Sequence, residues 1–215
     1  MKLKLHAFPL SPRSFKVLAV ANHLGLEYDL VFCDLTKGEQ RRPEFGAINP
    51  NHKVPALEDG DLKLWESNAM IQYLASLKPE RGLLPTDERA RAQVAQWMFW
   101  ESTTWDPAIA ILAFERGVKA ILGLGAPDPV EIEKGTQKAN AAFAILDAHL
   151  KGRPFVCGDG LTLADFALGS ALVLEEMAQL PIAPYAEIKR WGAQLSALPA
   201  WQATLALRTP PAAAA

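Results

Sequence analysis

The chain has 215 residues, half of them hydrophobic, and a formal net charge of -2 at pH 7. This composition supports a large buried core in one domain or two, and we expect two. The absence of a broad basic field argues against nucleic acid as a partner. No apolar run reaches the roughly 20 residues that a membrane span needs, and the first residues lack the apolar core of a signal peptide. We therefore expect a cytoplasmic protein without a membrane partner.

The two cysteines, Cys33 and Cys157, lie in separate apolar segments and are expected to be buried, reduced thiols. The chain has four histidines and no Cys-x-x-Cys motif, so the sequence offers no ligand set for a metal ion. No metal cofactor is expected.

The first third of the chain alternates between strand and helix patterns. Residues 2–8 are predicted to form a strand, residues 14–24 a helix, and residues 28–33 a second strand. Together they make a β-α-β unit. A polar loop follows at 34–42, and a short helix is expected over 43–47.

The next segment combines a proline-bounded strand, a hairpin and a helix start. The residue before a proline favours an extended backbone, so Val54 is expected to present its N–H and C=O outward, and a cis bond to Pro55 is compatible with this pair. Such a backbone edge can hold a peptide-like ligand by strand addition. The Asp-Gly pair at 59–60 predicts a hairpin turn. Ser67 then lies at a helix start, where unpaired N–H groups favour a carboxylate.

A proline- and glycine-bearing stretch then separates this region from long helical patterns. We expect a first domain over residues 1–78, a linker over 79–88, an all-helical domain over 89–209 and a disordered tail over 210–215. Helices are predicted over 88–113, 130–150, 163–177, 185–195 and 199–207, and Pro107 is expected to kink or break the first of them.

Thr162 and Asp165 have the spacing of a helix capping box, with Asp in place of the usual Glu or Gln. We interpret this pair as structural and the cap as worth about 1 kcal/mol. A catalytic role for Asp165 is the less favoured alternative.

These features, in this order, resemble the cytosolic glutathione S-transferase family. The resemblance rests on the run from Phe8 to Leu18, on residues 49–55, on the Glu-Ser pair at 66–67 and on the cap at 161–166, and it covers nearly the whole chain. It implies an α/β thioredoxin-like N-terminal domain, with Pro55 as its cis-proline, plus an all-α C-terminal domain, usually in a homodimer. The first turn resembles that of the serine-type phi, tau, theta-like and bacterial forms, because no Tyr lies near the end of the first strand.

Dithiol relatives carry Cys-Pro-x-Cys at the turn where this chain has Ser11-Pro12-Arg13-Ser14. Hydroxyls replace both thiols, which disfavours a glutaredoxin-like oxidoreductase. A charge-assisted hydrogen bond of roughly 1.5 to 3 kcal/mol to a glutathione thiolate would lower the thiol pKa by about one or two units. We expect Ser11 to be the donor, with Ser14 as second candidate. The local residues alone favour an N-cap Ser before an N1 Pro, without catalysis, and the resemblance reverses that preference.

The resemblance also implies how the γ-glutamyl part of glutathione would be held. Glu66 is expected to face its ammonium group and Ser67 its carboxylate. Without the resemblance, these two residues would be an ordinary helix start.

The rest of the tripeptide is expected to lie along the preceding loop. Val54, before Pro55, would pair its backbone with the cysteinyl unit, and Lys53 matches a position that reaches the glycyl carboxylate. Phi-like relatives use a His-Lys pair for that end, and this chain has Gln40-Arg41 instead. Arg41 and Lys37 are therefore weaker candidates, because a charged run of this kind is usually an ordinary solvated surface.

The candidates for contact with the electrophile are Phe8, Leu10 and Trp105, although aromatic residues on helices more often belong to the core. The expected function is conjugation of glutathione, as co-substrate, to small hydrophobic electrophiles in detoxification. A glutathione-dependent peroxidase or isomerase and a non-catalytic binding or scaffold protein stay open as alternatives.

Overall fold

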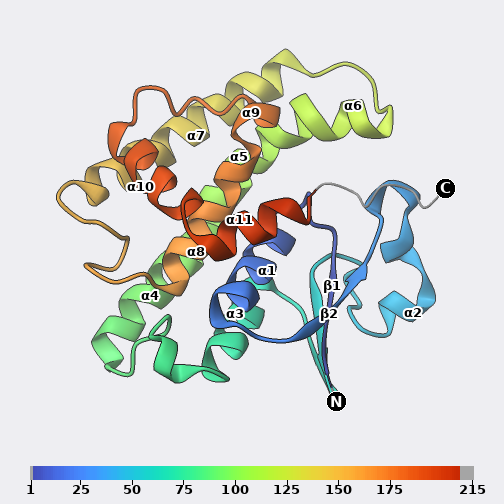
Figure 1. The fold of residues 1–215 in the computed structure, drawn as a ribbon. Helices are drawn as coiled ribbons and strands as arrows, with labels where there is room; N and C mark the ends of the chain where they lie inside the picture. The colour runs from blue at the N-terminus through green and yellow to red at the C-terminus, as the bar shows by residue number, and fades with distance from the viewer. Residues whose placement is uncertain (1, 209–215) are drawn as a thin grey trace. The chain divides into compact units, whose positions relative to one another are not determined.

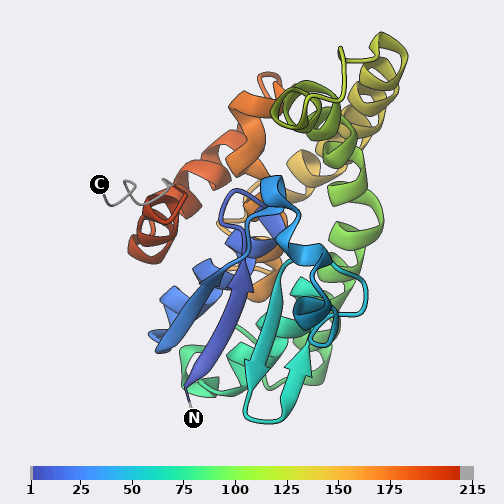
Figure 2. The same cartoon turned by 90° about the vertical axis from the view of Figure 1, so that its right-hand side faces the viewer.

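The computed structural model describes residues 2–208, which form a four-stranded sheet and a set of helices. The strand order is β2-β1-β3-β4 (Figure 2). Strand β1 (Leu3–Ala7) runs parallel to β2 (Tyr28–Phe32) and antiparallel to β3 (Ala56–Asp59), which pairs antiparallel with β4 (Leu62–Leu64). The predicted β-α-β start and the hairpin are both confirmed, and Gly60 takes the left-handed conformation in the hairpin turn, with φ of 63°.

The described chain divides into two compact units. The first holds the residues up to Gly82 together with those from Ser196 onward, and the second is Leu83–Leu195. Helix α11 (Pro199–Ala206), which the sequence places in the helical domain, therefore groups with the first unit. The tail expected over 210–215 lies outside the described residues.

The sheet of the first unit is covered by helices on both faces. Leu3, Leu5 and Ala7 are buried on one face of β1, and they alternate with residues that point to the other face. Helices α1 (Pro12–Leu24) and α3 (Ser67–Ser76) lie on one side of β1 and β2, and α2 (Pro43–Gly46) lies on the other (Figure 1).

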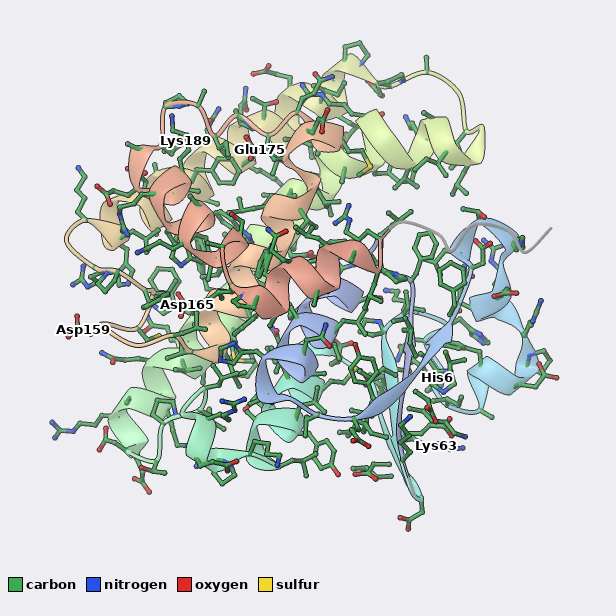
Figure 3. All side chains as sticks on the ribbon, viewed as in Figure 1. His6, Lys63, Asp159, Asp165, Glu175 and Lys189 are labelled. Carbon is green, nitrogen blue, oxygen red and sulfur yellow. The ribbon has the colours of Figure 1, made fainter. Side chains whose placement is uncertain are left out.

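His6 lies on the face of β1 that α2 covers (Figure 3). Its ring packs edge-on against the Phe45 ring of α2, with ring centroids 6.1 Å apart. Its Nε2 lies 2.7 Å from a carboxylate oxygen of Glu58 on β3. The His6–Glu58 pair therefore joins the neighbouring strands β1 and β3.

The first unit also contains short 3₁₀ turns, at Leu35–Lys37, Glu39–Arg41 and Pro79–Arg81.

Helix α11 is built into the first unit by an aromatic pair and a chain of hydrogen bonds. Trp201 packs edge-on against Phe15 of α1, with ring centroids 4.8 Å apart. The Tyr28 hydroxyl donates to Asn22 Oδ1, and Asn22 Nδ2 donates to Thr204 Oγ1 at 2.8 Å. Strand β2, helix α1 and helix α11 are therefore linked through one side chain, Asn22.

The second unit is helical, as predicted. Its elements are α4 (Glu88–Trp100), α5 (Asp106–Ala113), α6 (Lys119–Leu122), α7 (Pro129–Leu150), α8 (Leu163–Gly169), α9 (Glu175–Ala178) and α10 (Ala186–Ser196), with a 3₁₀ segment at Ser170–Leu174. None of the helices in the described part of the chain is long and apolar enough to cross a membrane.

The first long helix does not break at Pro107. The chain stays helical from Glu88 to Leu122, with π-helical turns at Glu101–Trp105 and Phe114–Val118. The first π turn ends just before Asp106-Pro107, so the change in hydrogen-bond pattern falls where proline has no N–H to donate.

The predicted capping box is confirmed at the start of α8. Asp165, labelled in Figure 3, is fully buried, as its exposed fraction of 0% shows. One of its carboxylate oxygens accepts hydrogen bonds from the N–H and the hydroxyl of Thr162 at 2.9 and 3.0 Å. The other oxygen accepts from the Val156 N–H at 2.8 Å and from Trp191 Nε1 at 2.9 Å. Burial raises the pKa of this carboxyl, and the four hydrogen bonds oppose the shift. Asp165 is thus a structural hub of the second unit.

Candidate functional site

Ser11 lies at the turn between β1 and α1, at the N-cap position of the helix. Its backbone is extended, with φ of -73° and ψ of 129°, and its N–H donates to the Phe8 carbonyl at 2.8 Å. Within the described residues, its hydroxyl makes no capping hydrogen bond. The hydroxyl is therefore left for another partner at the positive end of the α1 dipole.

Ser14 has a different environment, although it lies in the same turn. It is fully buried, and its Oγ accepts a hydrogen bond from the Phe8 N–H at 3.2 Å. This contact ties the end of β1 to the first turn of α1 and favours a structural role for Ser14.

The Val54-Pro55 peptide bond is cis, as the resemblance implies. Val54 is buried with Cys33, Phe45 and Ala56 in a small hydrophobic cluster. The loop before it is organised by Asn49, a residue to which the sequence analysis gave no role. Asn49 is 3% exposed, and its Nδ2 donates to the Lys53 carbonyl at 2.6 Å. Asn49 thereby fixes the backbone that leads into the cis bond.

The two basic candidates for the glycyl end lie on neighbouring loops. Lys53 is exposed, and so is Arg41 at the end of the second 3₁₀ turn. His52 Nδ1 lies 2.8 Å from the Gln40 carbonyl oxygen, so the two loops are hydrogen-bonded to each other. Arg42 pairs with Glu39 at 3.0 Å, and the structure assigns no such ion pair to Arg41 among the residues it describes. This contrast distinguishes Arg41 from its charged neighbour.

The start of α3 brings Glu66 and Ser67 together. Glu66 is exposed and has a φ of 67°, in the region that favours glycine. Strained backbone conformations of non-glycine residues cluster at active sites, ligand clamps and switch regions. Ser67, the first residue of α3, is 7% exposed and lies beside the unpaired N–H groups of the helix start.

Lys16 is the residue of this region that the sequence analysis missed. It is only 1% exposed, and its Nζ donates to Ser67 Oγ at 3.2 Å and to Asn68 Oδ1 at 2.8 Å. The available signal was a lysine inside an otherwise apolar run of α1.

The three electrophile candidates are not brought together within one unit. Phe8 is half-buried against Phe32, with ring centroids 5.8 Å apart, and Leu10 is 40% exposed beside Ser11. Trp105 is fully buried in the second unit, where its Nε1 donates to the Leu168 carbonyl at 3.0 Å. The environment of Trp105 is that of a core residue, which is the alternative that the sequence left open for aromatic residues on helices.

Both cysteines are free thiols, as expected, although Cys157 is only partly buried. Burial raises the pKa of Cys33 and of Cys157 to about 11, so each thiol stays protonated at neutral pH. Among the described residues, no group of three or more His, Cys, Asp or Glu side chains could hold a metal ion.

Comparison with known proteins agrees with this geometry. Residues 1–76 match the family model of the glutathione S-transferase N-terminal domain, and residues 129–203 match that of the C-terminal domain. The chain is 37% identical to glutathione S-transferase 3 of Zea mays over 99% of both chains. This chain belongs to the glutathione S-transferase family.

Solved glutathione transferases share the fold of this family member. Glutathione transferase F7 from Populus trichocarpa matches with a TM-score of 0.89 and 30% identity, covering 96% of this chain and 99% of its own. Glutathione transferase URE2P8 from Phanerochaete chrysosporium, solved with oxidized glutathione, matches with a TM-score of 0.86 and 25% identity, covering 96% and 95%. The expected combination of a thioredoxin-like domain and a helical domain is therefore confirmed.

Proposed function

We propose that this transferase conjugates glutathione to small hydrophobic electrophiles, and that it is a serine-type enzyme in which Ser11 stabilises the thiolate. Similarity to named glutathione S-transferases over the whole chain supports the activity. The observation that carries the role of Ser11 is its hydroxyl, which makes no capping bond at the N-terminus of α1 among residues 2–208.

The chemistry requires a thiolate, because the thiol itself is a poor nucleophile. A thiol with a pKa of about 8.5 is mostly protonated at pH 7. The Ser11 hydroxyl would donate a hydrogen bond to the sulfur anion, and the positive end of α1 would add to this stabilisation. The thiolate then forms a C–S bond to the electrophile and displaces its leaving group, or adds to its double bond.

The remaining site residues would position the tripeptide. In this proposal Glu66 faces the γ-glutamyl ammonium group and Ser67 faces the carboxylate, while the Val54 backbone pairs with the cysteinyl unit. Lys53 and Arg41 would reach the glycyl carboxylate. Both side chains are exposed, and Arg41 has no ion pair within the part of the chain that the structure describes; these observations support the two roles.

The electrophile would meet the thiolate near Phe8 and Leu10, which share the turn with Ser11. We also propose, from family membership, a homodimer that works in the cytoplasm in detoxification. Reduction of peroxides and isomerisation would use the same thiolate, so they are second activities to assay rather than a different site.

The test is the pKa of the glutathione thiol bound to the protein, measured from thiolate absorbance against pH. We expect a bound pKa well below that of free glutathione, and a loss of about one to two pKa units of that depression in Ser11→Ala. Ser14→Ala is the matched control, because it removes the neighbouring hydroxyl of the same turn. A depression lost in Ser14→Ala and kept in Ser11→Ala would transfer the role to Ser14. Absence of binding at millimolar glutathione would favour the scaffold alternative.

A further inference from the structure

A lysine is buried behind the start of α3, where its charge lowers the stability of the fold unless polar groups compensate it. Lys16 lies in the middle of α1, is 1% exposed, and reaches across to α3 with its Nζ. Burying an ammonium group away from water is unfavourable, and hydrogen bonds must offset that cost. Two of these bonds go to consecutive residues at the first turn of α3, Ser67 and Asn68.

The chemistry of the two groups determines the direction of the hydrogen bonds. An ammonium group has three donors and no acceptor, so Ser67 Oγ must accept from Lys16. The hydroxyl of Ser67 keeps one proton, and that proton is directed away from Lys16. It is therefore available to an acceptor on the other side of Ser67, where the N-terminus of α3 favours an anion.

Asn68 fixes the position of the lysine in turn. Its Oδ1 accepts from Nζ at 2.8 Å, a shorter distance than the 3.2 Å to Ser67 Oγ. The hydrogen bond to Asn68 thus keeps the ammonium group at hydrogen-bonding distance from Ser67, and its charge adds to the positive potential at the N-terminus of α3.

We propose that Lys16 is a positioning residue for the γ-glutamyl carboxylate of glutathione. It orients the Ser67 hydroxyl toward that carboxylate and supplies a positive charge behind it. The proposal rests on the proposed function, because it assumes that glutathione binds at the start of α3. It goes further by assigning part of the recognition to a side chain that does not touch the ligand.

The test compares two ligands in the same variants. The first is glutathione, and the second is 4-aminobutanoyl-cysteinyl-glycine, which lacks only the carboxylate of the γ-glutamyl part. We expect Lys16→Met to weaken glutathione binding by roughly 10- to 100-fold and binding of the second ligand by less than about threefold. Lys16→Arg keeps the charge and the donors, so it should restore most of the discrimination between the two ligands.

A role through Ser67 predicts coupling between the two residues. In a Ser67→Ala background, Lys16→Met should weaken glutathione binding much less than it does in the parent protein. Two results would overturn the proposal and leave Lys16 as a packing residue. One is equal weakening of the binding of both ligands by Lys16→Met, and the other is a loss of glutathione binding that is as large in the Ser67→Ala background as in the parent.

The design also separates this proposal from the proposed function. If the parent protein binds no glutathione, the proposed function fails, and the proposal fails with it. If the parent binds both ligands equally, glutathione binding stands and the recognition of the carboxylate is overturned. Should Lys16→Met not fold, Asn68→Ala answers the same question, because it removes the acceptor that holds Nζ. It should weaken the binding of glutathione more than the binding of the second ligand. An equal loss of binding for both ligands would contradict the proposal.

Discussion

Removing the Trp201 side chain should destabilise the first unit, although this residue lies far along the chain from the rest of it. Trp201 is 4% exposed, and its ring packs against Phe15, which is fully buried in α1. A buried aromatic side chain removes about 150–250 Å² from water, which corresponds to about 4–6 kcal/mol at 25 cal/mol per Å². Measured Trp-to-Ala substitutions in cores cost about 3–5 kcal/mol, so we expect Trp201→Ala to fall in that range.

Amide hydrogen exchange of peptides from α1 (Pro12–Leu24) is the appropriate measurement, because it reports on the first unit alone. A loss of 3–5 kcal/mol should lower the protection of these amides by about 10²- to 10³-fold or more. The matched control is Gln202→Ala, which changes the adjacent, exposed residue of the same helix. Unchanged protection of α1 in Trp201→Ala, or an equal fall in Gln202→Ala, would refute the assignment of α11 to the core of the first unit.

Two further predictions concern buried polar groups. Asp165→Ala leaves four donors without their acceptor and should lower the free energy of unfolding by at least about 3 kcal/mol in urea titrations, whereas the exposed Asp159→Ala should change it by less than about 0.5 kcal/mol. Equal urea midpoints for the two variants would contradict the role of Asp165 as a hub. Burial, helped by Arg81, lowers the pKa of His23 below 6.5, so the folded state binds this proton less readily than the unfolded state. Stability should therefore fall as the pH drops through about 6.5 toward the lower folded pKa, and the urea midpoint of His23→Gln should fall less between pH 7.5 and 5.5. Parallel falls in the two proteins would show that His23 is not responsible.

The elements of the fold could be predicted from the sequence because their signals are local. Strand and helix periodicity, the Asp-Gly turn at 59–60 and the spacing of Thr162 and Asp165 each act over a few residues, and each was found in the structure. In contrast, no local signal predicts that α11 belongs to the first unit. This membership depends on contact between Trp201 and Phe15, and no local pattern encodes a contact between positions so far apart.

The candidate site divides in the same way. Motif residues such as Ser11, Pro55 and Ser67 could be named from the sequence because their order resembles a family pattern. Lys16 could not, since a lysine in a helix is normally a solvated side chain, and its burial follows from where α3 begins. Asn49 was visible only as part of a motif, and its bond to the Lys53 carbonyl is what gives it a role.

The two π-helical turns have a consequence for how this helical unit can change its length. A π turn closes its hydrogen bond over five residues instead of four, so it contains one residue more than an α turn. Deleting one residue from Glu101–Trp105 or from Phe114–Val118 converts that turn to an α turn, and the helix beyond it keeps nearly the same facing, because the π turn and the α turn each make about one revolution. The same deletion in a regular α-helical stretch would rotate everything beyond it by about 100°. The two π turns are therefore the places where this helix can lose one residue and still present the same faces on either side.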